Sequence, residues 1–245
     1  MKRIIVMTSG KGGVGKTTCA VYLGRKLVGL GNNVLLIDGD VGLRNLDLAL
    51  GLQDDVVYDF YDILRGLVKP EQAIIPAKEK GLFLLAAPQI NTDYKLRIGD
   101  MRAVCEQIVT HHGFDYIIID CPAGIGREFE ACVAAADLAL VVTTPDVVAN
   151  RDADRAIGVL EKMGTKQMML LINKVRGDLI RKGKSLNINE VIDILGIDAL
   201  GIVPEDDRIL MGDPEKVVYA GKAFENIARR LEGEAVPLLK LRRKR

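Results

Sequence analysis

A glycine-rich segment near the N-terminus fits the pattern G-x-x-x-x-G-K-[ST]; it reads Gly10-Lys11-Gly12-Gly13-Val14-Gly15-Lys16-Thr17. An apolar run at residues 4–7 precedes it, and a segment with helical periodicity begins at Lys16. Glycines allow successive backbone N–H groups to turn inward around phosphate oxygens, and the N-terminus of the following helix adds partial positive charge. The segment therefore predicts a strand, a phosphate-binding loop and a helix, in that order. A glycine-rich turn without a ligand is the alternative.

The two lysines of this loop predict different functions. Lys16 would reach the β and γ phosphates of a nucleotide, and the Thr17 hydroxyl would bind Mg²⁺. Lys11 directly follows the first glycine, and a second lysine for the same phosphates would be redundant. We therefore expect Lys11 to point outward to phosphates held by another copy of the chain, which predicts a nucleotide-sandwich homodimer. An incidental surface charge is the alternative for Lys11.

Short apolar runs alternate with segments of helical periodicity along the rest of the chain. The runs are continuous in Ile, Val and Leu, which is typical of strands buried on both faces of a mainly parallel sheet. They lie at residues 4–7, 34–37, 82–86, 116–119, 138–142, 168–172 and 200–203, and the helical segments at 16–30, 59–66, 94–111, 127–135, 150–163 and 221–231. The alternation predicts an α/β fold: a single doubly wound, mainly parallel sheet with helices on both faces. Residues 176–185, with four basic residues and two glycines, predict a mobile surface loop.

Composition indicates one domain followed by a basic end. The 245 residues are 49% hydrophobic and 27% charged, which suits a globular domain over residues 1–235. The short, weakly amphipathic tail, residues 236–245, carries five basic residues, and without them 29 basic side chains remain against 33 acidic ones. An anionic partner or a solvated end would explain such a tail.

The sequence predicts neither export nor a membrane span. Its apolar runs are far shorter than the roughly 20 residues that cross a bilayer. The N-terminus leads directly into a strand and leaves no room for a signal peptide. The four cysteines form no C-x-x-C pair, so we expect reduced, mostly buried thiols in a cytoplasmic protein.

Carboxylates follow two of the predicted strands. Asp38 and Asp40 come after the run at 34–37, and Asp120 comes after the run at 116–119. Parallel strands bring their carboxyl ends to one edge of the sheet, so these side chains should meet beside the phosphate loop. One of them would hold the Mg²⁺ shell and another would position the attacking water, although helix caps or turn residues are the alternative. Residues 122–124, Pro-Ala-Gly, predict a compact turn that senses the γ-phosphate.

Together these segments resemble the deviant Walker A ATPases, and they span nearly the whole chain. They are GKGGVGKTT at 10–18, DGDVGLRNLDLALGL at 38–52, DCPAGIG at 120–126, TPDVVANRDADRAIG at 144–158, INKV at 172–175 and VPEDDRIL at 203–210. The segment at 38–52 resembles most closely the branch of this family that places the division septum.

The resemblance implies a function for particular residues. Lys11 matches the signature lysine that reaches across the ATP-bound dimer, and Gly12–Thr18 match the phosphate cradle. Asp40 matches the switch aspartate of hydrolysis, and Asp38 and Asp120 match carboxylates near the metal's water shell. Asn173 matches the asparagine that faces the adenine, although it could be only a turn residue, and Pro204, Glu205 and Asp206 match the strand end that lines the base. Arg151, Asp152 and Asp154 match the surface where the family forms its dimer and binds partners; a solvated helix N-terminus is the alternative for them.

The resemblance also implies partners and a location. We expect an ATPase that depends on ATP and Mg²⁺ and dimerises when ATP is bound. It should associate reversibly with the inner face of the cell membrane, recruit a division inhibitor and respond to a polar topological factor. The family usually continues into a longer amphipathic helix, whereas here Val236, Leu238, Leu239 and Leu241 are interleaved with basic residues. One such tail should bind an anionic membrane surface weakly, and two tails on a dimer more strongly.

Three alternatives remain open from the sequence. A flagellar-number ATPase resembling FlhG, or a chromosome-partitioning ATPase resembling ParA, belongs to the same superfamily, but the acidic body predicts no specific nucleic-acid partner. A redox protein resembling the nitrogenase iron protein would need two cysteines at a shared cluster, and neither Cys105 nor Cys132 lies in a glycine-rich loop. A nucleotide-binding scaffold that never hydrolyses ATP is the third.

Overall fold

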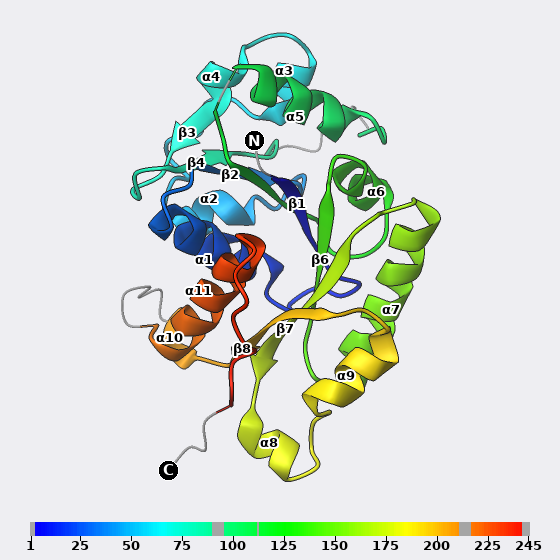
Figure 1. The fold of residues 1–245 in the computed structure, drawn as a ribbon. Helices are drawn as coiled ribbons and strands as arrows, with labels where there is room; N and C mark the ends of the chain where they lie inside the picture. Colours follow the sequence, from blue (N-terminus) through cyan, green and yellow to red (C-terminus); the bar gives the residue numbers. More distant parts are fainter. Residues whose placement is uncertain (1–2, 90–95, 112, 211–216, 242–245) are drawn as a thin grey trace.

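The computed structural model describes residues 3–89, 96–111, 113–210 and 217–241 (Figure 1). Within these residues eight strands form one sheet: β1 (Arg3–Thr8), β2 (Val34–Asp38), β3 (Ile74–Pro76), β4 (Leu82–Leu85), β5 (Tyr116–Asp120), β6 (Leu138–Thr143), β7 (Met168–Val175) and β8 (Ala199–Pro204). Their order across the sheet is β3-β4-β2-β5-β1-β6-β7-β8. All neighbouring strands pair in parallel except β3 and β4.

Helices cover both faces of this sheet (Figure 1). They are α1 (Lys16–Gly29), α2 (Asn45–Leu50), α3 (Phe60–Leu64), α4 (Pro70–Ala73), α5 (Asp100–His111), α6 (Arg127–Val133), α7 (Val147–Lys162), α8 (Gly177–Arg181), α9 (Ile188–Leu195), α10 (Asp207–Leu210) and α11 (Tyr219–Leu231). Side chains from α3 to α7 and α9 pack on one face, and those from α1, α2 and α11 pack mainly on the other. The predicted doubly wound α/β fold is confirmed.

Burial on both faces explains why the strands read as continuous apolar runs. In β1, Ile4 and Val6 belong to the core on one face, while Ile5 and Met7 belong to the core on the other. Successive side chains of a strand point to opposite faces, so a strand covered on both sides needs an apolar residue at every position. All seven runs expected from the sequence are strands in the structure.

Several short elements were not expected. The strand β3 has three residues and ends in a proline at the edge of the sheet, which gives little sequence signal. Helices α2, α4, α9 and α10 are also short. Residues 176–185 were expected to be a surface loop, and that prediction was wrong in part because α8 occupies five of them. No residue of α8 is fully buried, so the segment does lie at the surface.

The segment after α11 packs back on the domain. Arg230 donates from Nε to the carbonyl of Val236 at 2.6 Å and from Nη1 to that of Leu200 at 2.5 Å. The Tyr219 hydroxyl donates to the carbonyl of Lys240 at 2.8 Å. Side chains of the tail also join the core: Leu238 and Leu241 on one side, Leu239 on the other. The described part of the tail, up to residue 241, is therefore continuous with the domain, while the predicted basic residues 242–245 lie outside the described residues.

A search of the helices in the described residues finds none that combines the length and apolar character needed to cross a membrane.

Candidate nucleotide-binding site

The glycine-rich loop lies between β1 and α1 and needs glycine at specific positions. Gly13 and Gly15 have φ of 78° and 95°, which favour glycine over residues with a side chain. A Cβ on Gly15 would lie 2.5 Å from Nδ2 of Asn173, and one on Gly10 would lie 1.7 Å from the carbonyl oxygen of Asp152. The loop thus packs directly against β7 and α7, and a larger residue would force these elements apart.

A cavity of about 510 Å³ lies at the carboxyl edge of the sheet beside this loop. Many of the residues expected at a nucleotide site line it: Gly12, Gly13, Gly15, Lys16, Thr17, Thr18, Asp40, Asn173, Pro204, Glu205 and Asp206. The turn after β5 reaches it as well, because a Cβ on Gly12 would lie 3.7 Å from the Cβ of Ala123. Its volume and its position at the carboxyl ends of parallel strands suit a small-molecule ligand.

Five other expected residues lie around the cavity and do not line it. Val14 is buried beneath the loop, and Asp38 and Asp120 lie buried at the ends of their strands. Gly10 packs on α7, and the exposed Lys11 lines a neighbouring hollow of about 400 Å³.

Lys16 is held inside the site by a short hydrogen-bond chain. Its Nζ donates to the Ser9 hydroxyl at 3.0 Å, and that hydroxyl donates to the carbonyl of Lys11 at 2.7 Å. The side chain is almost fully buried, and its positive charge lowers the pKa of Asp40 and Asp120 against the larger effect of burial. A buried ammonium group beside inward-facing backbone amides can hold phosphate oxygens.

Asp38 and Asp120 occupy the same register position on adjacent strands. Asp38 accepts hydrogen bonds from the backbone amides of Asp40 at 2.9 Å and Leu46 at 3.0 Å. Asp120 accepts one from the Thr17 hydroxyl, and its Oδ1 finds no hydrogen-bond partner in the described part of the chain. Burial raises the pKa of Asp38 to about 6 and that of Asp120 to about 7, with a further contribution from the repulsion between carboxylates.

This arrangement fits a hydrated divalent cation. A fully buried carboxylate oxygen without a partner is costly, and a cation or its coordinated water would satisfy it. Thr17, Asp38 and Asp120 together supply the hard oxygen atoms that Mg²⁺ prefers. Asp40 is only half-buried and lines the cavity, so it lies closer to the space that a ligand would fill.

The segment after β2 contains site residues that the sequence analysis missed. Leu43 and Asn45 of this segment line the cavity. Ile209 of α10 also lines it and was likewise not expected. Arg44 has φ of 42° and forms a nearly buried ion pair with Asp47 at 2.5 Å. Leu43, Arg44 and Asn45 all lie in the segment at 38–52 that carries the family resemblance. That resemblance was the sequence signal from which their presence at the site could have been inferred. The ion pair could not be foreseen because it depends on the left-handed conformation of Arg44.

Two side chains of β7 tie that strand to the glycine-rich loop. Asn173 donates from Nδ2 to the carbonyl of Val14 at 2.8 Å, and Lys174 donates from Nζ to the carbonyl of Gly13 at 2.7 Å. Lys174 has φ of 53°, a left-handed conformation that is unusual for a residue with a side chain. The amide nitrogen of Asn173 is therefore committed to the loop, while the residue still lines the cavity.

The first turns of α7 form an exposed surface beside the site. The helix begins at residue 147, earlier than expected, and the Asp146 side chain caps it by accepting from the amide of Ala149 at 2.9 Å. Arg151 and Asp154 are exposed, and Asp152 lies 3.7 Å from Arg155. Val147 and Val148 are 70% and 57% exposed, so an apolar patch accompanies the charges.

The thiols lie away from the surface. Cys105 and Cys132 are buried, and burial raises the pKa of Cys105 to about 12. A cluster shared between two copies of a chain needs thiolates at the interface. The positions of these cysteines do not fit that chemistry.

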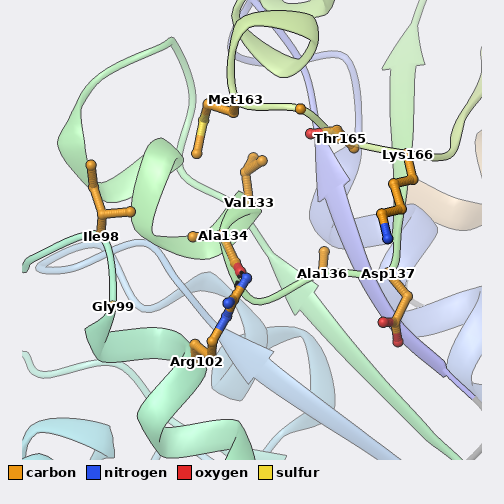
Figure 2. A pocket seen from close by; sticks show the side chains of 11 residues that line it. Ile98, Gly99, Arg102, Val133, Ala134, Ala136, Asp137, Met163, Thr165 and Lys166 are labelled. Carbon is orange, nitrogen blue, oxygen red and sulfur yellow. Dashed lines mark hydrogen bonds between the residues drawn. The ribbon is translucent and has the colours of Figure 1, made fainter.

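Another hollow, of about 640 Å³, lies at the opposite edge of the sheet (Figure 2). Its charged side chains hold the fold together: Arg102 donates to the carbonyl of Ala134, and Asp137 accepts from the amide of Ile4 at 2.8 Å. Met163, Val133 and Ile98 supply apolar lining. Because it faces the amino ends of the strands, it shares no residue with the glycine-rich loop.

Comparisons with known proteins are consistent across sequence and structure. The family model ParA, described as NUBPL iron-transfer P-loop NTPase, matches residues 1–220. The septum site-determining protein MinD of Synechocystis is 44% identical over 248 residues, covering 98% of this chain and 92% of that protein.

Solved structures agree. MinD in the MinC:MinD complex of Aquifex aeolicus is similar with a TM-score of 0.88 and 40% identity over 97% of this chain and 98% of that one. The septum site-determining MinD of Pyrococcus horikoshii complexed with Mg-ADP has a TM-score of 0.81 and 29% identity over 95% and 96%.

Proposed function

Because the chain belongs to the ParA family of P-loop NTPases, and within it to the septum site-determining MinD proteins, we propose that it binds ATP with Mg²⁺ and hydrolyses it to help place the division septum. The observation that carries this proposal is the cavity beside the glycine-rich loop: Lys16 and Thr17 line it, and Thr17 is hydrogen-bonded to the buried Asp120, whose Oδ1 has no partner among the described residues. The relative from P. horikoshii was solved with Mg-ADP, which supports the choice of ligand.

Binding uses the loop and the two strand ends beyond it. The backbone amides of Gly12–Gly15 and the start of α1 hold the phosphates, and Lys16 leaves the Ser9 hydroxyl to bind the β and γ phosphates. The base would lie near Asn173 and residues 204–206, which line the same cavity. Because Nδ2 of Asn173 is bonded to the carbonyl of Val14, its side-chain oxygen is the atom that would accept a hydrogen bond from the adenine amino group. The Thr17 hydroxyl and the carboxylates of Asp38 and Asp120 would hold Mg²⁺ and its water shell, and the bound cation would supply positive charge to offset that of the phosphates.

Hydrolysis depends on Asp40. Its carboxylate lies in the cavity, where burial raises its pKa and Lys16 lowers it. From this position it would orient the attacking water toward the γ-phosphate, and the turn at Ala123, which lines the same cavity, would sense that phosphate. A scaffold that only binds nucleotide would show no turnover, so steady-state ATPase assays separate the two.

A second copy of the chain completes the site. Lys11 is exposed and does not line its own cavity, which leaves it able to reach the phosphates of a partner. Leu43 and Ile125 are 69% and 44% exposed near the carboxyl edge, and with Val147 and Val148 they give the dimer an apolar contact.

Lysine substitutions test the dimer. Lys16→Ala should abolish nucleotide binding, whereas Lys11→Ala should bind nucleotide normally but remain monomeric with a non-hydrolysable ATP analogue. Nucleotide titration and light scattering measure the two properties. Equal behaviour of the two variants would contradict the assignment.

The dimer acts with other components of division. A MinC-like inhibitor binds it, as the Aquifex complex suggests, on the surface that includes Arg151, Asp152 and Asp154. A MinE-like or other polar factor stimulates turnover. The dimer associates peripherally and reversibly with the anionic inner face of the cell membrane through its basic tail. We expect no specific nucleic-acid partner, and three relatives at 42–44% identity are septum site-determining proteins.

The structure changes how the tail would work. The side chains of Leu238, Leu239 and Leu241 already pack against the core, so inserting them into lipid first requires breaking these contacts. ATPase activity and sedimentation, each with and without vesicles of anionic lipid, test the membrane step. Binding to duplex DNA but not to these vesicles would favour the chromosome-partitioning alternative.

A further inference from the structure

The end of the described tail meets α8. A Cβ on Gly177 would lie 3.6 Å from the Cβ of Leu241, and both residues line a hollow of about 420 Å³ that also contains Arg181. The hydrogen bond from Tyr219 to the carbonyl of Lys240 holds the preceding residue in place. The tail thus ends beside a helix that is distant in sequence but adjacent in space, at the lower end of the view in Figure 1.

Exposed basic side chains lie on both of these segments. Arg181 and Lys182 are exposed at the end of α8, and Lys240 is exposed in the tail. Among the described residues none of these three forms an ion pair, whereas Arg176 is occupied by Asp178 at 3.0 Å and Glu205 at 3.5 Å. The residues after Leu241 read Arg-Arg-Lys-Arg and lie outside the described part of the chain.

An anionic lipid surface fits this combination better than a nucleic acid. In the tail Lys240 lies between Leu239 and Leu241, and aliphatic side chains beside cations suit the boundary between lipid headgroups and acyl chains. The body of the chain carries more acidic than basic side chains, which disfavours nonspecific binding to the phosphates of DNA. With the leucines packed on the core, the first contact with a membrane would be mainly electrostatic.

We propose that Arg181 of α8, Lys182 directly after it and Lys240 form a second lipid-contacting surface that binds anionic headgroups beside the tail. We call it the α8 surface. This inference rests on the membrane association proposed above and adds a contact outside the tail. It makes binding depend on ionic strength, because exposed charges are screened by salt and buried leucines are not.

The test compares two double variants of the full chain. Arg181→Gln with Lys182→Gln removes two charges from the α8 surface, and neither residue lines the nucleotide cavity. Lys78→Gln with Lys80→Gln is the matched control, since both lysines are exposed on the β3–β4 connection, far from α8 (Figure 1). Lys184 is left unaltered because it shares a hollow with Lys11.

Binding is measured by sedimentation with vesicles of phosphatidylcholine mixed with phosphatidylglycerol, in the presence of Mg²⁺ and a non-hydrolysable ATP analogue, at low and high salt. Each basic residue near an anionic leaflet strengthens binding about fivefold, so the α8 variant should bind about 25-fold more weakly than wild type at low salt. The control should lose at most a fewfold. Nucleotide affinity and thermal unfolding of both variants should match wild type.

The outcomes separate the two proposals. If wild type binds these vesicles and the α8 variant binds equally well, the α8 surface is refuted while membrane association through the tail stands. If wild type does not bind the vesicles, both fail. If the α8 variant loses affinity for duplex DNA while wild type binds DNA and not vesicles, the surface belongs to a nucleic-acid site and the lipid proposal is overturned.

Discussion

Asp120→Asn should stabilise the nucleotide-free protein at high pH. Asp120 is buried, its Oδ1 has no partner in the described residues, and Asp38 lies on the adjacent strand. Burial raises the pKa of Asp120 from 3.8 to about 7, so the folded protein retains a proton that the unfolded chain releases. For an acid with a raised pKa, stability falls as pH rises through the interval between the two values and is constant above it. The asparagine variant carries no such group.

The magnitude follows from the two pKa values. With a pKa shift of about three units, titration of Asp120 lowers the free energy of unfolding by about 4 kcal/mol at pH 8, relative to low pH. At pH 5 the decrease is only about 1.5 kcal/mol, because the folded protein still binds the proton. The free energy of unfolding of the variant, relative to wild type, should therefore increase by about 2.5 kcal/mol between about pH 5 and about pH 8. Titrating groups that do not interact with Asp120 cancel in this comparison, whereas Asp38 is released from the repulsion of the Asp120 carboxylate in the variant.

Urea denaturation in chelator, without nucleotide, measures both proteins at the two pH values. Asp193→Asn is the matched control, because that carboxylate is exposed on α9 and should leave the pH dependence unchanged. A variant that is no more stable than wild type at pH 8, or whose advantage is the same at both pH values, would refute the reasoning. With Mg²⁺ and an ATP analogue the order should reverse, because the ionised carboxylate then has a cation to bind.

Three further substitutions test the packing around the site. Gly10→Ala places a Cβ 1.7 Å from the carbonyl oxygen of Asp152. We therefore expect the free energy of unfolding in urea to fall by about 2–3 kcal/mol and the binding of an ATP analogue to weaken; an unchanged urea midpoint would contradict the close approach of the loop to α7. Gly201→Ala places a Cβ 2.2 Å from Cγ1 of Ile227 and should cost about 1–3 kcal/mol, with partial recovery when Ile227→Ala is added; simple additivity would argue against the contact. Tyr116→Phe removes the hydrogen bond from its hydroxyl to Glu232 at 2.9 Å and should lower stability by about 1 kcal/mol without affecting turnover, which thermal unfolding and ATPase assays check.

The sequence patterns predicted the larger elements because their signals are local. Continuous apolar runs specified seven strands, and the glycine-rich motif specified the loop between β1 and α1. The edge strand β3 was missed, since three residues ending in proline carry almost no periodicity. Residues 176–185 were interpreted as a loop because glycine and charge dominate there, yet five of them form α8.

The candidate site was predictable in its chemistry and less so in its contacts. The motif and the strand ends identified Lys16, Thr17 and the carboxylates without any knowledge of the sheet order. The hydrogen bond from Asn173 to the carbonyl of Val14 joins residues 159 positions apart, and the local sequence of neither segment predicts it. The ion pair of Arg44 with Asp47 likewise depends on a left-handed backbone that local propensity disfavours.

The sequence by itself determined the order of seven strands and of the longer helices, the phosphate-binding loop and the placement of carboxylates at strand ends, since these follow from residue periodicity and from the handedness of L-amino acids. Only the tertiary structure decided which strands became neighbours, how closely Gly10 approaches α7, and that the leucines of the tail pack on the core. Those features arise from contacts between residues far apart in the chain. Their free energies depend on how two surfaces fit together, which neither segment encodes alone.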